Sequence, residues 1–337
     1  MRSPVDPTAA EFDVIGMGNA LVDVLSHESE ELVGSLGVAK GSMTLVDEAR
    51  SAEIYAMTGP AVEISGGSAA NTIVGVAAMG GRAEYVGKVR DDQLGHVFAH
   101  DIRAMGVTFE VPPAPGGPAT GACLILVTPD AQRTMNTYLG ASVHLGPDDV
   151  DPARIERASI LYLEGYLFDP PEAQEAFRIA ASYAHEAGRV VSATLSDSFC
   201  VERHHAAFLD LVRNHVDLVF ANEAEILALY RTDDFDEALA RVRDDVEFAA
   251  LTRSEKGSVL VGRGEVLEVS AEPVETLVDT TGAGDLYASG FLHGFGRGAA
   301  LEACGVLGSH AAAEVISHLG ARPEADLAEM ARGVLGP

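Results

Sequence analysis

The segment VDTTGAGDLYASGFLHGF, residues 278–295, has the residue types and spacing needed for chemistry on a phosphate group. Gly282, Ala283 and Gly284 form a turn of small residues, and the residues that follow can continue as a helix. Backbone N–H groups in such a turn, together with the positive end of the helix dipole, favour a bound anion. Asp285 stands beside them, where a carboxylate could accept a proton from an attacking hydroxyl. The pattern is typical of an anion hole next to a general base, although a simple N-capping aspartate has the same sequence.

Short apolar runs that end in loops indicate the strands that would carry such a site. The strand candidates are 12–16, 83–86, 160–163, 190–193, 218–221 and 249–252, and helical patterns occupy 67–79, 171–187, 205–214, 223–229 and 235–242. This alternation predicts an α/β fold with a mainly parallel central sheet flanked by helices on both faces. In such folds, functional residues gather at the carboxyl ends of the strands.

A second, smaller sheet is expected from segments that break this alternation. Residues 107–110, 122–128 and 134–138 have the pattern of consecutive antiparallel strands, and residues 21–25 also alternate apolar and polar side chains. We interpret the second sheet as a discontinuous β lid over the carboxyl edge of the main sheet, within a single domain that spans residues 1–337. Its expected segments are 19–27, 41–47 and 106–140.

Composition excludes several function classes. The formal net charge of −28 repels nucleic acid and anionic lipid, so neither is an expected partner. No apolar run reaches the roughly 18 to 20 residues of a membrane span, and the first residues lack the apolar stretch of a secretory signal. Three widely spaced cysteines argue against a disulfide framework. The sequence therefore predicts a cytoplasmic protein.

Two familiar nucleotide motifs do not fit. Gly16-Met17-Gly18 follows a strand, but Leu21 stands where a dinucleotide fingerprint needs its third glycine. The pair at 87–88, Gly-Lys, lacks both the upstream glycine and the following hydroxyl residue of a P-loop. A nicotinamide oxidoreductase is therefore a weak alternative.

Three motifs together resemble the PfkB family of carbohydrate and nucleoside kinases. DTTGAGD at 279–285 is similar to its C-terminal signature, SGGSAANTIVGVAAMGGRAEYVGKVRDDQLG at 65–95 to its N-terminal signature, and ANEAE at 221–225 to its Asn-x-x-Glu motif. They occur in the family's order, and the similarity covers nearly the whole chain. The resemblance implies a ribokinase-like fold with a β-sheet lid, ATP as donor, Mg²⁺, and nucleotide binding by residues 215–330.

The resemblance also implies where the phosphoryl acceptor binds. Asp23, in GNALVD, matches an aspartate that holds two vicinal hydroxyls, and Gly67 lets a hydroxyl approach the backbone. Arg133 matches a lid arginine near the transferred phosphate. Tyr166, with Phe168, lies where adenosine kinases of the family present aromatic residues to the base. The expected substrate-binding residues are Asn19, Asp23, Gly67, Asn71, Arg133 and Tyr166.

The same resemblance implies which residues contact ATP, the phosphoryl donor, and the metal ions. Asn222 and Glu225 resemble a pair that arranges Mg²⁺ through water, consistent with the hydration that Mg²⁺ retains. Ser254 replaces the middle glycine of the family's nucleotide-contacting turn. The expected ATP-binding residues are Asn222, Thr252, Ser254, Gly257, Gly282 and Gly284. Many relatives bind a monovalent cation such as K⁺, largely through carbonyl groups, at positions matching Asp279, Thr281 and Gly320, a site that the sequence leaves open.

The sequence indicates the type of reaction more clearly than the identity of the phosphoryl acceptor. GNALVD and GGSAAN favour the 5′-hydroxyl of adenosine. A free sugar such as ribose, fructose or a ketodeoxy sugar is the closest alternative, and a nucleoside- or sugar-binding regulator without turnover is an alternative of another class. Either a monomer or a lid-mediated homodimer is compatible with the sequence.

Overall fold

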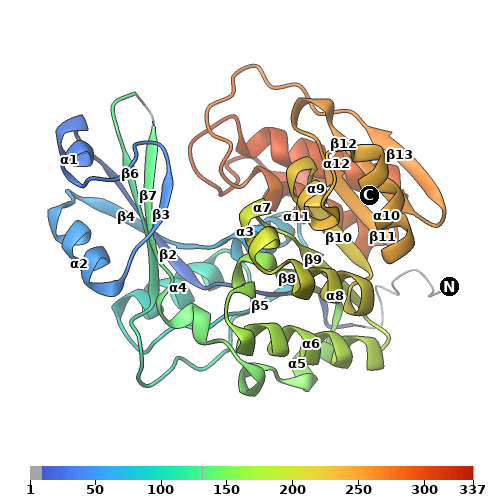
Figure 1. Cartoon of the computed structure of the whole chain (residues 1–337), viewed down its shortest axis with the longest axis horizontal. Helices are drawn as coiled ribbons and strands as arrows, with labels where there is room; N and C mark the ends of the chain where they lie inside the picture. Colours follow the sequence, from blue (N-terminus) through green and yellow to red (C-terminus); the bar gives the residue numbers. More distant parts are fainter. Residues whose placement is uncertain (1–9, 131, 337) are drawn as a thin grey trace.

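Two β-sheets organise the chain in the computed structural model, which describes residues 10–130 and 132–336 (Figure 1). The main sheet has eight strands in the order β13-β12-β11-β10-β9-β8-β1-β5. Its strands β11, β10, β9, β8, β1 and β5 run parallel to one another. Strands β12 and β13 form an antiparallel edge next to β11. The strands are β1 (Phe12–Met17), β5 (Ala83–Val86), β8 (Ala158–Glu164), β9 (Val190–Thr194), β10 (Leu218–Asn222), β11 (Phe248–Thr252), β12 (Ser258–Gly262) and β13 (Glu265–Val269).

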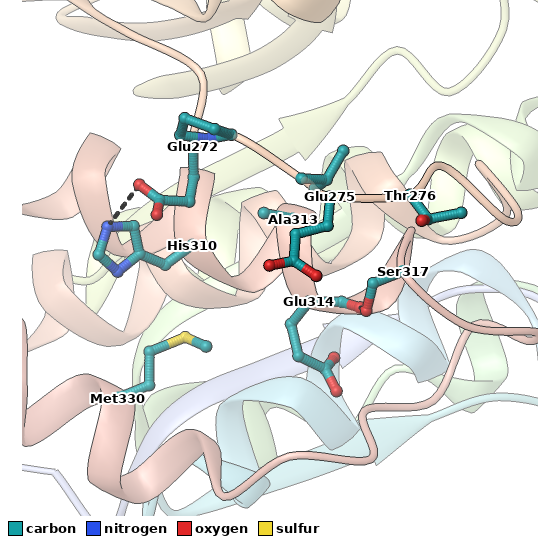
Figure 2. A pocket seen from close by; sticks show the side chains of 10 residues that line it. Glu272, Glu275, Thr276, His310, Ala313, Glu314, Ser317 and Met330 are labelled. Atoms are coloured by element: carbon teal, nitrogen blue, oxygen red, sulfur yellow. Dashed lines mark hydrogen bonds and ion pairs between the residues drawn. The ribbon is translucent and has the colours of Figure 1, made fainter.

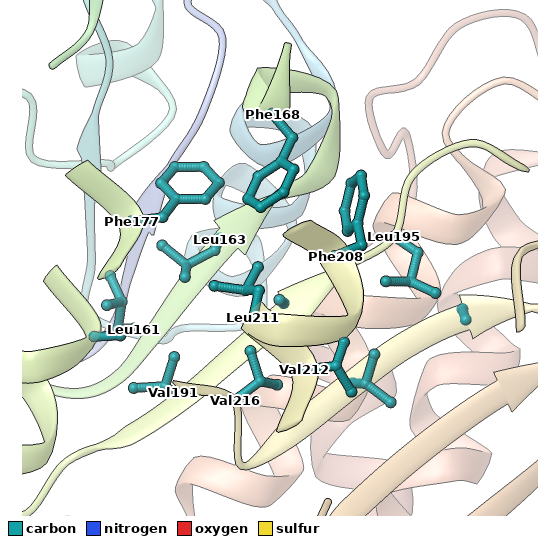
Figure 3. Close-up of a cluster of buried hydrophobic side chains, with 14 of the residues drawn as sticks. Leu161, Leu163, Phe168, Phe177, Val191, Leu195, Phe208, Leu211, Val212 and Val216 are labelled. Carbon is teal, nitrogen blue, oxygen red and sulfur yellow. The ribbon is translucent and has the colours of Figure 1, made fainter. Parts of the chain in front are cut away.

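Helices cover both faces of the main sheet because each parallel strand is apolar on both sides. Leu161 and Leu163 point into one core and Ile160 and Tyr162 into the other. Figure 3 shows part of the first core. That core is covered by α5 (Pro152–Glu156), α6 (Pro171–Glu186), α8 (His205–His215), α9 (Glu223–Tyr230) and α10 (Phe235–Asp245). The second is covered by α3 (Ser68–Ala78), α4 (Gln93–Ala104), α11 (Ala283–Gly296) and α12 (Leu301–Val315).

Shorter helices complete the main body. Helix α13 (Leu327–Leu335) packs against α11 and α12 through a separate small apolar cluster, and α7 (Ser198–Arg203) follows β9. The 3-10 helices are η1 (Gly140–His144), η2 (Pro147–Asp149), η3 (Gly165–Phe168) and η4 (Ser254–Lys256).

The small sheet stands to the left of the main body in Figure 1 and has the order β3-β7-β6-β2-β4. One of its faces packs against α1 and α2 through Val22, Val24, Val33 and Ile54. The other face carries Asp23. Its elements are β2 (Leu21–His27), α1 (Glu30–Ser35), β3 (Met43–Leu45), α2 (Glu48–Met57), β4 (Ala61–Gly66), β6 (Gly121–Val127) and β7 (Arg133–Tyr138).

The predicted fold class, the six main-sheet strands and the five helices are confirmed. The interpretation of 107–110 as a strand of the small sheet is wrong. Thr108 instead exchanges backbone hydrogen bonds of 2.9 Å with Ala83 and Tyr85, at the free edge of β5 in the main sheet. Phe109 is buried there against Phe98. Apolar alternation identifies a strand-like segment but does not say which sheet it joins.

Strand β4 was not predicted as part of the small sheet. It pairs antiparallel with β2 at the edge of the sheet, and only its last two residues are buried. An edge strand with so little buried surface has a weak apolar pattern. It nevertheless matters for the site, because it ends at Gly66, directly before the turn that enters α3.

The main sheet has a topological switch point at β1. The chain goes from β1 to β5 on one side and later returns to β8 on the other. In such sheets a crevice opens at the carboxyl ends of the strands around this point. The segment that leaves β1 passes through Asn19 directly into β2, so the small sheet is attached at the same crevice.

The turn around Gly257 generates a stability prediction. Gly257 has φ +86°, and a Cβ there would lie 2.0 Å from the carbonyl oxygen of Val269. Gly264 has φ +82° with open space around it. Gly264→Ala should lose about 1–2 kcal/mol of unfolding free energy through its left-handed backbone alone, and Gly257→Ala should lose clearly more. Urea unfolding of both variants measures this; equal losses would contradict a tight contact at Gly257.

Candidate active site

The carboxylate of Asp285 lies where two helices from distant parts of the sequence meet. Ser68 Oγ donates a 2.6 Å hydrogen bond to Asp285 Oδ1, and Asn71 Nδ2 donates one of 3.0 Å to Oδ2. Helices α3 and α11 can approach closely because Gly75 has no side chain. A Cβ at this position would lie only 2.4 Å from Ser289 Oγ. Each oxygen of Asp285 thus has a defined donor, and the carboxylate is held in one orientation.

The turn before α11 has the backbone conformation that an anion hole needs. Gly282 has φ +79°, a conformation that favours glycine, and a Cβ there would lie 2.7 Å from Ala321 Cβ. The amide of Ala283 already donates to the carbonyl of Thr280 at 3.2 Å. Gly284 is exposed, and a Cβ there would meet nothing within 4 Å. The open space at Gly284 lets a ligand approach this helix end, while the Ala283 amide is partly committed to the turn.

Asp23 reaches the same region from the small sheet. Its carboxyl group packs on Gly66, where a Cβ would lie 2.3–2.5 Å from the carboxyl atoms. The next residue, Gly67, has φ +101°, and a Cβ there would lie 2.4 Å from the carbonyl oxygen of Asn19. Both glycines are therefore required for the turn to pass between Asp23 and Asn19.

Both aspartates have raised pKa values for the same physical reason. Burial raises the pKa of Asp285 to about 6, against the hydrogen bonds from Ser68 and Asn71 and the charge of Arg322, which lower it. Burial also raises the pKa of Asp23 to about 6, and Arg322 again lowers it. A group with a pKa near 6 is deprotonated at neutral pH yet more basic than an ordinary aspartate, as suits a general base.

Glu164 is a buried carboxyl group that the motif analysis missed. It ends β8, and its Oε2 accepts a 2.6 Å hydrogen bond from the backbone N–H of Asn19. Burial raises its pKa to about 8. The side chain of Asn19 is itself buried and accepts from Ser142 Oγ at 2.8 Å. These contacts fix the segment that joins the two sheets, so Asn19 contributes at least to the scaffold of the site.

Arg133 contacts the loop before the glycine turn. Its Nη1 lies 2.7 Å from Asp279 Oδ2, and both side chains are buried. Its Nε and Nη2 are buried without an acceptor in the described residues. Two free guanidinium donors beside a candidate anion hole suit a phosphate oxygen.

The carboxylate of Asp279 is committed to donors of the protein itself. Besides Arg133, it accepts from the N–H of Gly320 at 3.1 Å and from the N–H and Oγ1 of Thr281 at 3.0 and 2.7 Å. A guanidinium beside it repels a second cation. The side chain of Asp279 therefore does not fit a monovalent-cation ligand in this conformation.

Asn222 and Glu225 form a capping box at the start of α9. Asn222 Nδ2 donates to Glu225 Oε1 at 2.6 Å, and the two backbone amides are bonded reciprocally to the side chains at 3.0 and 2.9 Å. Burial raises the pKa of Glu225 to about 7. Residues 10–130 and 132–336 contain no group of three or more His, Cys, Asp or Glu side chains able to hold a metal. The pair fits water-mediated contact with Mg²⁺ that the donor phosphates bring.

The turn after β11 keeps the conformation expected of a glycine-containing motif. Ser254 has φ +52° and Gly257 φ +86°, so the serine adopts the left-handed backbone of the glycine it replaces. Thr252 pairs with Asn222 across the neighbouring strand ends. The predicted donor-contacting residues of β10 and β11 thus lie side by side at the carboxyl edge of the sheet.

Aromatic side chains flank the crevice, but not all of those predicted. Tyr166 is 41% exposed. Partial burial of its hydroxyl raises its pKa, and the nearby charges of Asp197 and Asp285 raise it further. Phe168 is buried in the core, with its ring 4.3 Å from that of Phe208 (Figure 3), so its predicted contact with a base is wrong. Phe199 in α7 is 73% exposed, and α7 packs against η3, which carries Tyr166. Phe199 is thus an exposed aromatic residue beyond the carboxyl end of β9, and the sequence analysis missed it.

A cavity of about 510 Å³ lies along the loop that leads to Asp279 (Figure 2). Glu272 and His310 face each other across part of it at 3.2 Å. Its lining residues come from this loop, from α12 and the residues just after it, and from α13: Glu272, Pro273, Val274, Glu275, Thr276, His310, Ala313, Glu314, Ser317 and Met330. No sequence motif predicts this cavity, because its lining residues are spread over 59 positions, from 272 to 330.

The geometry agrees with a family comparison. Residues 31–327 match the pfkB family carbohydrate kinase model. The chain belongs to this family. Its members transfer a phosphoryl group to an alcohol, so this pfkB kinase is a phosphotransferase with ATP as its expected donor. The oxidoreductase alternative is thereby excluded.

Named relatives of this pfkB kinase differ in their acceptors. An adenosine kinase from Sinorhizobium meliloti is 51% identical, with a TM-score of 0.88 over 96% of this chain and 99% of that one. A probable sugar kinase from Rhizobium etli is 49% identical, with the same TM-score and coverage. A 5-dehydro-2-deoxygluconokinase from Geobacillus kaustophilus is 28% identical over 75% of this chain and 78% of its own. Within residues 10–130 and 132–336, no helix of the kinase is both long and apolar enough to cross a bilayer.

Ser68 gives a direct test of how the kinase sets the basicity of Asp285. Ser68→Ala removes a hydrogen bond to the charged carboxylate, so the pKa of Asp285 should rise further above 6. Because a general base acts in its deprotonated form, we expect the acidic limb of the kcat/KM profile to move to higher pH. Ser192→Ala, which removes a buried hydroxyl bonded to Leu161, is the control and should leave the limb in place. An unmoved limb in Ser68→Ala would contradict the assignment.

Proposed function

We propose that this kinase transfers the γ-phosphoryl group of ATP to the 5′-hydroxyl of adenosine. The observation that carries this acceptor is the exposed pair Tyr166 and Phe199, at the carboxyl ends of adjacent strands β8 and β9. A planar base can stack on such side chains, whereas a free sugar gains little from them. Asp23, opposite, suits the two vicinal hydroxyls of a ribose.

In this proposal Asp285 is the general base. Its carboxylate takes the proton of the attacking hydroxyl while the new bond to phosphorus forms. Asn71 Oδ1 is buried without a hydrogen-bond donor in the described part of the chain, so it can accept from an acceptor hydroxyl. The donors of Asn71 and Ser68 keep Asp285 aimed at the same place.

The charge of the transferred group is stabilised by the start of α11 and by Arg133. The amides around Gly282 and Gly284 receive the phosphoryl oxygens, and Nε and Nη2 of Arg133, which have no acceptor among residues 10–130 and 132–336, add positive charge. We place the base and ribose of ATP in the cavity along 272–276, since its carboxylates disfavour phosphates there. Mg²⁺, when bound with the donor phosphates near Glu225, neutralises part of their charge.

The small sheet is proposed to close over the acceptor and exclude water. Arg133 already joins it to the donor side through Asp279. Met43, Leu45 and Val62 are exposed apolar residues of this sheet. In a homodimer formed through the small sheet they would be covered, whereas in a monomer they would remain at the rim.

A free-sugar kinase is the second candidate. The contacts of Asp23, Gly67 and Asn71 require only hydroxyl groups, and the relatives from Rhizobium etli and Geobacillus kaustophilus have sugar-kinase names. A ribose, fructose or ketodeoxy acid would use the same base and anion hole but would leave the aromatic pair without a role.

An acceptor panel with ATP and Mg²⁺ separates the two candidates. Adenosine should give the highest kcat/KM among adenosine, ribose, fructose and 5-dehydro-2-deoxygluconate. Phe199→Ala should lower kcat/KM for adenosine about 5- to 150-fold, the equivalent of about 1–3 kcal/mol of base stacking. Val266→Ala, which shortens an exposed apolar side chain on β13, is the control and should change nothing. A higher kcat/KM for any free sugar would overturn the adenosine proposal.

A further inference from the structure

Three consecutive residues near the C-terminus each contact a different part of the active site. The N–H of Gly320 donates to Asp279 at 3.1 Å. Ala321 fills the space beside Gly282, which leaves no room for a side chain there. Arg322 points the other way, toward α3 and β4. The segment 320–322 therefore lies between the glycine turn and the acceptor side.

The side chain of Arg322 brackets the Gly66–Gly67 turn. Its Nη2 donates to the carbonyl oxygen of Ser65 and, at 3.0 Å, to Ser65 Oγ. Its Nη1 donates to the carbonyl oxygen of Ala70 at 3.2 Å. One guanidinium thus joins the residue before the turn to the first turn of α3, which carries Ser68 and Asn71.

Ser65 is anchored independently on its other side. Asp101 Oδ2 accepts from the N–H of Ser65 at 2.7 Å and from its Oγ at 2.6 Å. Asp101 belongs to α4, in the second core of the main body. The path from Asp101 through Ser65 to Arg322 connects that helix to the segment 320–322, which packs against the loop around Asp279 and Gly282.

We propose that Arg322 is a positioning residue for phosphoryl transfer, which holds the acceptor turn and the anion-hole loop in one fixed relation. The proposal rests on the proposed function of this site. This role requires the planar, forked guanidinium group, because two of its nitrogens reach three acceptor oxygens on two segments of the chain. A lysine presents a single point charge and cannot reproduce that arrangement.

Electrostatics support the same role. Arg322 lies near the carboxylates of Asp23, Asp101 and Asp285, yet its hydrogen bonds in the described part of the chain go to carbonyl and hydroxyl oxygens. Its positive charge lowers the pKa of both Asp23 and Asp285. The guanidinium therefore favours the charged form of two groups whose neutral form burial favours.

The test uses the full chain with Arg322→Lys and Arg322→Ala. We expect the KM for the acceptor to rise about 10- to 100-fold in Arg322→Ala, as for loss of charged hydrogen bonds, while the KM for ATP changes less than about 2-fold. Millimolar guanidinium should partly restore the acceptor KM of Arg322→Ala. The acceptor KM of Arg322→Lys should stay close to that of Arg322→Ala. The matched control is Arg154→Ala, which removes a partly buried arginine paired with the buried Glu84 away from the site. It should lower stability without a selective change in acceptor KM and without rescue.

Hydrogen exchange provides a readout that does not depend on the acceptor. In Arg322→Ala, exchange should speed up in peptides covering 66–74 and 279–286 and stay unchanged in α6 and α8. Unchanged exchange at 66–74, or equal rises in the KM values for acceptor and ATP, would overturn the proposal. If the wild-type chain phosphorylates no acceptor while the exchange pattern appears as expected, the proposed function fails and the structural link through Arg322 stands.

Discussion

The site depends on one contact, that between the first turn of α3 and the first turn of α11. Ser68 and Asn71 on the former hold both oxygens of Asp285 on the latter, across 217 and 214 positions of sequence. Burial at this contact raises the pKa of Asp285, while its two donors keep the charged form accessible. Neither helix end would form a candidate site alone. The close approach at Gly75 is the packing feature that brings them together.

The sheets place the remaining groups around this contact. The switch point at β1 opens the crevice, and the segment from Asn19 into β2 carries Asp23 across it. Glu164 and Tyr85 fix that segment through the backbone N–H and C=O of Asn19. Several buried carboxyl groups with raised pKa values therefore lie in one region, which is unfavourable for folding in itself. Such an arrangement is common where a site needs groups that change protonation near neutral pH.

Much of the fold and the centre of the site could be predicted because each depends on a pattern of residues that are adjacent in the sequence. Each parallel strand is an apolar run, and the glycine turn with Asp285 is contiguous. The segment 107–110 was misplaced because the choice between two sheets depends on tertiary pairing. Phe168 was wrongly predicted to contact a base and Phe199 was missed, because exposure, not residue type, separates a core ring from a ring that a ligand can reach. Arg322 carries no local pattern, since its partners lie more than 250 positions away.

The central claim, that Asp285 accepts the proton of the acceptor, is tested most directly by single-turnover rates of phosphoryl transfer measured by rapid quench. Asp285→Asn keeps the shape of the side chain and removes its basicity. We expect a rate about 10²- to 10⁴-fold below wild type at neutral pH, with acceptor and ATP affinities little changed. In the wild type the rate should fall as pH drops below about 6, where Asp285 becomes protonated. An Asp285→Asn rate above about a tenth of the wild-type rate would contradict it.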